Sequence, residues 1–230
     1  MLLPMSYKLA ATMNNVGVTL MEERETNCNE SYQYTAAKGL FQNAWQTLNM
    51  PNARQIDGSA LPQQLSVLSA WLSQSNTEIN LVSPFDDQPS SSFFLVQRAL
   101  TLRDTVDIDS SQTQLANAVI LFNLALLHQL TAPHSRDISH LYRNCAAALV
   151  DIPDSDETFL LSVACLNNVG VWCHAAGDVA GAQSTMEQLS GLLAAEDEYD
   201  LEEPVLRGVQ SNIICTLEGM EEISFLAGAA

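Results

Sequence analysis

The chain has 230 residues, of which 47 % are hydrophobic and 16 % charged, and its formal net charge is −18 at pH 7. This composition is too apolar for a disordered protein, and the length suffices for one domain or a short repeat array with a buried core. Because nucleic acids and anionic membranes bind basic surfaces, the acidic charge excludes both as expected partners and favours a basic or neutral protein.

The first fifty residues predict a helical hairpin over about 7–50. Apolar residues from Leu9 to Leu20 recur at three- and four-residue spacing, as on one face of a helix. A second helix over about 32–49 follows an acidic, polar stretch, and Pro51 stops the chain directly after it.

Residues 51–111 are the least regular part of the sequence and are expected to form an irregular insertion. Prolines and serines between 76 and 92 indicate loops, while 79–82 and 93–102 are short runs with mixed β character. Periodicity cannot assign runs this short. They predict either a small β-hairpin insertion around 79–102 or irregular chain.

The rest of the chain predicts two more hairpins, over about 113–150 and 158–195, and a final helix over 205–223. Gly177 separates the two helices of the last hairpin, as expected for a C-terminal helix stop. The final helix is expected to cap the array by covering its last apolar face. All these elements are expected to form a single domain, 1–230.

The cysteines and the N-terminus predict an intracellular, cytoplasmic protein. No secretory signal pattern is visible, and the most apolar run, 115–130, is shorter than the roughly 20 residues of a membrane span. A buried helix is therefore expected there. Five cysteines without CxxC spacing are expected to be reduced thiols, mostly in apolar helices: Cys28, Cys145, Cys165, Cys173 and Cys215.

A short pattern recurs along the chain: an asparagine, an aliphatic residue, usually a small residue, and an apolar residue. It begins at Asn15, Asn123, Asn168 and Asn212, so that the last two intervals are 45 and 44 residues. Fixed-period self-similarity on this scale is typical of stacked helical hairpins. The first interval, 108 residues, is about two and a half periods and leaves room for the insertion.

Each hairpin also places a small residue on its first helix and a larger residue on its second. A small residue lets paired helices approach closely, and a large one fills the adjacent hole. The residues of this pattern are Val16–Gly17, Leu20, Ala37, Phe41 and Ala44; Leu124–Ala125, His128, Tyr142 and Cys145; and Val169–Gly170, Cys173, Gly177, Ala182 and Met186.

On these residues the chain resembles the tetratricopeptide repeat family, whose pattern has Leu–Gly and an aromatic residue in the first helix and Ala-x3-Phe in the second. The resemblance implies an all-α fold, a right-handed stack of antiparallel helical hairpins. The 44–45 residue interval also suits HEAT- or armadillo-like units, which stay open as the structural alternative.

In tetratricopeptide arrays the first helices line a concave groove, and some arrays carry an asparagine ladder there. The resemblance thus implies that Asn15, Asn123, Asn168 and Asn212 hold the backbone of an extended peptide, since an amide offers both a donor and an acceptor. The alternative is that each amide bonds to a neighbouring hairpin and only locks the stacking. If the amides bind a partner, substituting two of them by alanine should weaken binding and leave the melting temperature nearly unchanged.

Further residues on the same helices are expected to complete the groove: Val18, Met21, Phe122, Leu126, Gln129, Asn167, Val171 and His174. Each apolar member could instead be core. The first helices carry no Lys or Arg over 9–21, 113–130 and 158–176. The cationic clamp of the chaperone-binding members of the family is therefore not expected, and an apolar or basic peptide fits better.

No metal or cofactor site is expected. His134, Asp137 and His140 are spaced by three, which spreads their side chains by about 60° per step around a helix. No nucleotide-binding, hydrolase or metalloprotease motif appears. The sequence therefore predicts a non-enzymatic module that binds a protein or peptide, with a homo-oligomerisation module and an enzyme without a recognisable motif as alternatives.

Overall fold

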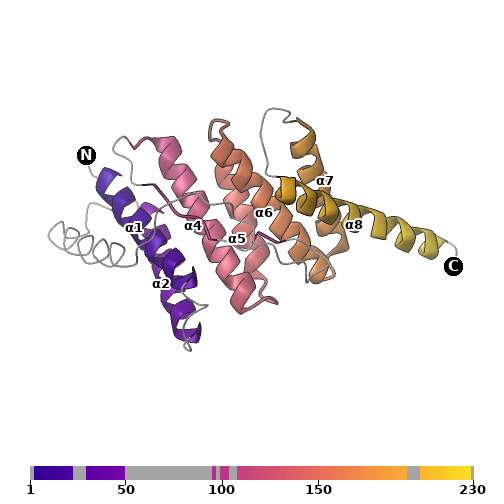
Figure 1. Ribbon diagram of the computed structural model, residues 1–230, viewed down its shortest axis with the longest axis horizontal. Coiled ribbons are helices and arrows are strands. Elements are labelled where there is room, and N and C mark those ends of the chain that lie inside the picture. Colours follow the sequence, from indigo (N-terminus) through magenta and orange to yellow (C-terminus); the bar gives the residue numbers. More distant parts are fainter. Residues whose placement is uncertain are drawn as a thin grey trace.

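The computed structural model describes residues 3–22, 30–49, 95–96, 99–103, 108–195 and 203–228, and this part of the chain is all-helical, without strands (Figure 1). The all-α fold class expected from the sequence is confirmed for these residues. Their seven helices, labelled as in Figure 1, are α1 (Leu3–Glu22), α2 (Glu30–Asn49), α4 (Ser110–Thr131), α5 (Asp137–Leu149), α6 (Asp156–Ala175), α7 (Val179–Ala195) and α8 (Glu203–Gly228).

Local signals in the sequence set several helix ends. Asp109 caps α4, because its carboxylate accepts a backbone N–H of the first turn at 2.8 Å. Ser155 forms a capping box with Thr158 at the start of α6. Gly177 has a φ of 75°, the left-handed conformation that glycine adopts without strain, and it confirms the predicted stop between α6 and α7.

Consecutive helices pack in pairs: α1 with α2, α4 with α5, and α6 with α7. Neighbouring pairs meet through α2 and α4 and through α5 and α6, and in Figure 1 they follow one another along the long axis of the molecule. The last helix, α8, packs on α7 and α6. A large core extends from α1 to α7, and a smaller core joins α6, α7 and α8.

Two glycines lie at tight contacts between paired helices. A Cβ atom built on Gly17 would lie 2.7 Å from the Phe41 ring, and one built on Gly170 would lie 2.6 Å from the Met186 methyl group. Both large side chains are fully buried. The structure therefore confirms that a large residue of the second helix fills the space that a glycine leaves on the first.

A short stretch shortly before α4 lies across the first helices. We call residues 95–103 the crossing segment; 95–96 and 99–103 are its described residues, and they contain no strand. Of the two predicted alternatives for 79–102, irregular chain holds for these residues, and asparagine side chains bind the backbone groups of Val96, Leu100 and Leu102; residues 79–94 lie outside the described residues. Most of the predicted insertion, 51–111, lies outside the described residues.

Helices α4 and α6 are long and apolar enough to cross a membrane by length and composition alone. Of their most apolar windows, 61 % and 67 % of the residues are buried inside the protein. A core helix that is covered on more than one side has the same composition. Both helices are covered in this way, by their paired helices and by the crossing segment.

Candidate functional site

Three of the repeated asparagines lie side by side on successive first helices and face the crossing segment. Asn15 comes from α1, Asn123 from α4 and Asn168 from α6, and all three are buried. We call these three residues the asparagine ladder and each of them a rung. Buried amides require hydrogen-bond partners, so what they bind decides what the site can do.

Each rung binds both backbone groups of a single residue. The Asn123 Oδ1 accepts the N–H of Leu100 at 2.7 Å, and its Nδ2 donates to the carbonyl of the same residue at 2.7 Å. Asn15 does the same with Leu102, at 2.7 and 2.8 Å. An amide side chain used in this way replaces the adjacent strand of a sheet, which would exchange the same two bonds.

The third rung repeats this geometry at the other end of the segment. Asn168 accepts the N–H of Val96 at 3.0 Å and donates to its carbonyl at 2.9 Å. The bound residues, 96, 100 and 102, are all even-numbered, as expected when alternate residues of an extended chain present their backbone groups to one side. The segment therefore runs from α6 to α1, opposite to the order of the helices in the chain.

A second layer of amides orients the ladder. The Nδ2 of Asn123 also donates to Asn14 Oδ1 at 2.8 Å, and the Nδ2 of Asn14 donates to the Leu100 carbonyl at 2.9 Å. The fourth repeated asparagine, Asn212, repeats the first of these contacts by donating to Asn167 Oδ1 at 2.7 Å. This bond links α8 to α6, as the stacking alternative expects.

Helix α4 has no second amide before its rung, and Tyr142 of α5 takes that place. Phe122 precedes Asn123, and its ring packs edge-on against Tyr142 at a centroid distance of 5.7 Å. The Tyr142 hydroxyl accepts from Asn168 Nδ2 at 3.1 Å and donates to Gln129 Oε1 at 2.8 Å. Burial raises the pKa of Tyr142 well above its usual value, so the phenol keeps the proton that it donates.

The apolar residues predicted to line the groove lie in the core instead. Val18, Met21, Phe122, Leu126 and Val171 are buried members of the two hydrophobic clusters. His174, near the end of α6, is exposed. Asparagines therefore bind the backbone of Val96, Leu100 and Leu102, while the apolar residues predicted for the groove pack in the core.

Sequence reasoning missed two parts of this site. It included Asn167 but not Asn14, although the doubled asparagine recurs at 14–15 and 167–168 and was a visible signal. It did not identify the crossing segment, whose bonds join residues 23 to 87 positions apart. No local pattern encodes contacts at such separations.

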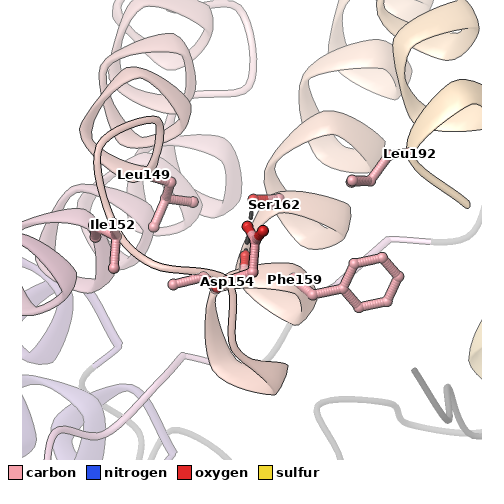
Figure 2. A pocket seen from close by; sticks show the side chains of 7 residues that line it. Leu149, Ile152, Asp154, Phe159, Ser162 and Leu192 are labelled. Carbon is pink, nitrogen blue, oxygen red and sulfur yellow. Dashed lines mark hydrogen bonds between the residues drawn. The ribbon is translucent and has the colours of Figure 1, made fainter. Parts of the chain in front are cut away.

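A small cavity lies away from the ladder, between the end of α5, the start of α6 and α7 (Figure 2). Its volume is about 70 Å³, which is far below the several hundred Å³ of typical ligand pockets. Asp154 is the one ionisable residue in its lining, so it offers no pair of groups for acid–base chemistry. The other lining residues are Leu149, Ile152, Thr158, Phe159, Ser162 and Leu192.

Outside the ladder, the described His, Cys, Asp and Glu side chains were the remaining candidates for metal binding or nucleophilic chemistry. Within the ranges that the structure describes, no three His, Cys, Asp or Glu side chains come together as metal ligands. Cys145 and Cys165 are buried free thiols whose Sγ atoms lie 3.0 Å apart. Burial raises the pKa of Cys165 well above its usual value, and a buried thiol of this kind is a poor nucleophile.

No family model matches the chain, and comparison with curated proteins and with solved structures likewise gives no match.

Proposed function

We propose that this chain is a tetratricopeptide-like, right-handed stack of antiparallel helical hairpins that acts as a non-enzymatic interaction module. Its asparagine ladder would hold an extended segment of a partner protein along the first helices. The pairing of consecutive helices and the close seams at Gly17 and Gly170 support the stack. The recurrence of the rungs on α1, α4 and α6 supports the shared binding face.

The observation that carries the proposal is the paired hydrogen bonding of the ladder, in which each rung takes the N–H and the C=O of one residue. All six bonds measure between 2.7 and 3.0 Å. Every residue except proline offers these two groups, so the ladder recognises extended backbone and not one particular sequence. Backbone recognition of this kind is the basis of peptide capture by strand addition.

Two of the rungs also make side-chain bonds that do not depend on the bound segment. Asn14 orients Asn123, and Tyr142 orients Asn168, through bonds between buried side chains. A preorganised amide loses little rotamer entropy on binding. In contrast, an unfilled buried amide costs about 1–3 kcal/mol for each unsatisfied group, so the ladder favours being occupied.

The proposal is tested with a chain whose own segment is weakened at two rungs. Leu100→Pro with Leu102→Pro removes the two backbone N–H groups that donate to Asn123 and Asn15. We call this variant the double-proline chain. We expect it to bind a fluorescent peptide with the sequence of residues 95–103 saturably, as measured by anisotropy. Adding Asn123→Ala should weaken that affinity by about 10- to 30-fold, because two bonds of about 1 kcal/mol each are lost.

The matched control is Leu100→Ala with Leu102→Ala, which removes the same side chains and keeps both N–H donors. It should bind the peptide less tightly than the double-proline chain, because its own segment still holds the ladder. The proposed function is contradicted if the double-proline chain keeps its helical circular dichroism but binds no peptide at about 1 mM. A dissociation constant of about 1 mM corresponds to a binding free energy of only about −4 kcal/mol.

A further inference from the structure

The crossing segment occupies the same ladder that a partner would need. Its backbone fills all three rungs, and the Arg103 carbonyl also accepts a bond from the Tyr7 hydroxyl at 3.2 Å. Because the rungs recognise backbone groups that every extended chain presents, they do not discriminate between this segment and another. Any partner segment therefore competes directly with residues 95–103.

The crossing segment has an unusual composition for this chain. It reads Leu–Val–Gln–Arg–Ala–Leu–Thr–Leu–Arg and holds two of the nine basic residues of the chain and none of the 27 acidic ones. The rest of the molecule keeps seven basic residues against all 27 acidic ones. The occupant and its host are thus oppositely charged, which favours their association and screens with salt.

Side-chain burial shows which positions of an occupant the helices contact. Val96, Ala99 and Leu102 are buried, whereas Leu100 and Thr101 are partly buried and Arg103 is exposed. Leu95 packs on the small core of α6 to α8, and Leu100 packs on the large core. An occupant therefore needs apolar residues at most of the described positions, a small residue near the middle and a polar or basic residue at the exposed position of Arg103.

We propose, building on the function proposed above, that residues 95–103 are a displaceable internal ligand. A partner protein takes their place with an extended segment of its own that is apolar and basic. The partner segment binds the rungs Asn123 and Asn15 through its backbone N–H and C=O groups, and the crossing segment leaves them. The ladder is closed to partners that lack such a segment.

The covalent attachment of the crossing segment lowers the apparent affinity of the ladder for a partner segment. A segment joined covalently to its own binding site competes at an effective concentration of about 1 mM. A partner present at about 1 μM therefore meets a competitor in roughly 10³-fold excess. The natural chain should bind a free segment about 10²- to 10³-fold more weakly than a chain in which the internal ligand no longer holds the ladder.

The experiment compares the natural chain with the double-proline chain, using the labelled 95–103 peptide and an analogue with both arginines replaced by glutamate. We expect the double-proline chain to bind the natural peptide at least 10-fold more tightly than the natural chain does. Each of the two chains should bind the glutamate analogue more weakly than it binds the natural peptide. In the natural chain, saturating peptide should raise the hydrogen-exchange rates of the Leu100 and Leu102 amides, because these amides leave the rungs.

Three results would overturn the exchange. Equal affinity of both chains, with the Leu100 amide still protected, would place the peptide elsewhere on the molecule. Binding by the double-proline chain alone, with no exchange in the natural chain at millimolar peptide, would make the crossing segment a permanent part of the fold while leaving the peptide-binding capacity of the ladder intact. A peptide-independent dimer in light scattering, with exposed Leu100 amides, would make a second copy the occupant. Failure of every chain to bind would instead contradict the proposed function.

Discussion

The first and second helices of each pair differ in how much of their surface is covered. In α4 and α6, 11 of 22 and 12 of 20 residues are buried, whereas in α5 and α7 only 4 of 13 and 4 of 17 are. The second helices bury one stripe against their partners. The first helices are covered on two sides, by the paired helix and by the crossing segment.

This difference explains why polar side chains persist inside the most apolar helices. Asn123 lies within an unbroken buried run of α4, and Asn167 and Asn168 lie within a similar region of α6. A buried amide without a partner is unfavourable, so these residues belong to helices whose second side meets peptide backbone. A doubly covered helix with a regularly placed asparagine therefore indicates where an extended segment docks.

The largest expected effect comes from removing a rung. Asn123→Ala leaves the N–H of Leu100 without its partner, removes one of the two bonds to the Leu100 carbonyl and breaks the bond to Asn14, so we expect the free energy of unfolding to fall by about 2–4 kcal/mol. Asn144→Ala, at an exposed position of α5, should change it by less than about 0.5 kcal/mol. Urea unfolding measures both.

This expectation replaces the one drawn from the sequence, in which rung substitutions left the melting temperature nearly unchanged. The reason is that the rungs are buried and bind the chain itself. Equal urea midpoints for Asn123→Ala and Asn144→Ala would contradict the described difference between first and second helices.

A smaller effect is expected at the seams between first and second helices. Gly17→Ala forces a methyl group against the rigid, buried ring of Phe41 and should lower the free energy of unfolding by about 1–3 kcal/mol. Gly170→Ala meets the flexible end of Met186, and the gain of about 0.5–1 kcal/mol in helix propensity should offset most of its cost. Calorimetry of both variants would reveal the difference, and a larger loss at Gly170 would contradict this reading of the seams.

The start of a first helix should be less sensitive still. Ser155→Ala removes the capping box of α6 and should cost about 1 kcal/mol. Ser190→Ala, at an exposed site within α7, makes the same chemical change without a cap and should be neutral within about 0.5 kcal/mol. Chemical denaturation of the pair tests this, and equal values would mean that the cap contributes nothing measurable.

The smallest effect is expected on the exposed edge of α6. Leu160 is 44 % exposed, so Leu160→Ala should lower the free energy of unfolding by no more than about 0.5 kcal/mol. Thermal unfolding at two protein concentrations measures this change. A loss above about 1.5 kcal/mol that grows with concentration would show that α6 is covered in solution on a further side.

Much of the fold followed from short-range signals. The apolar spacing predicted the helix that became α4, Gly177 predicted the end of α6, and the spacing of Asn123 and Asn168 predicted that they occupy equivalent places. These features depend on residues within a turn or two of one another, or on a repeated unit. Local propensity and periodicity report on both.

The parts that could not be predicted depend on contacts far apart in the chain. Val18 and Leu126 show the same spacing whether they face a groove or a core, so their burial was not readable from the sequence. The role of Tyr142 depends on a bond to α6, and the crossing segment depends on bonds to three helices. Those outcomes were decided by tertiary packing.

The path of the crossing segment also has a consequence for how the molecule reaches its native state. In a helical repeat array each unit ordinarily touches only its neighbours, so units form and melt semi-independently. Here a stretch that follows α2 in the chain is anchored on α6, 72 residues later, as well as on α1. During synthesis on a ribosome, this stretch can bind its last rung, Asn168, only after α6 has emerged. Once closed, it ties the first and third hairpins into a single cooperative unit that should fold more slowly than an array built from local contacts alone.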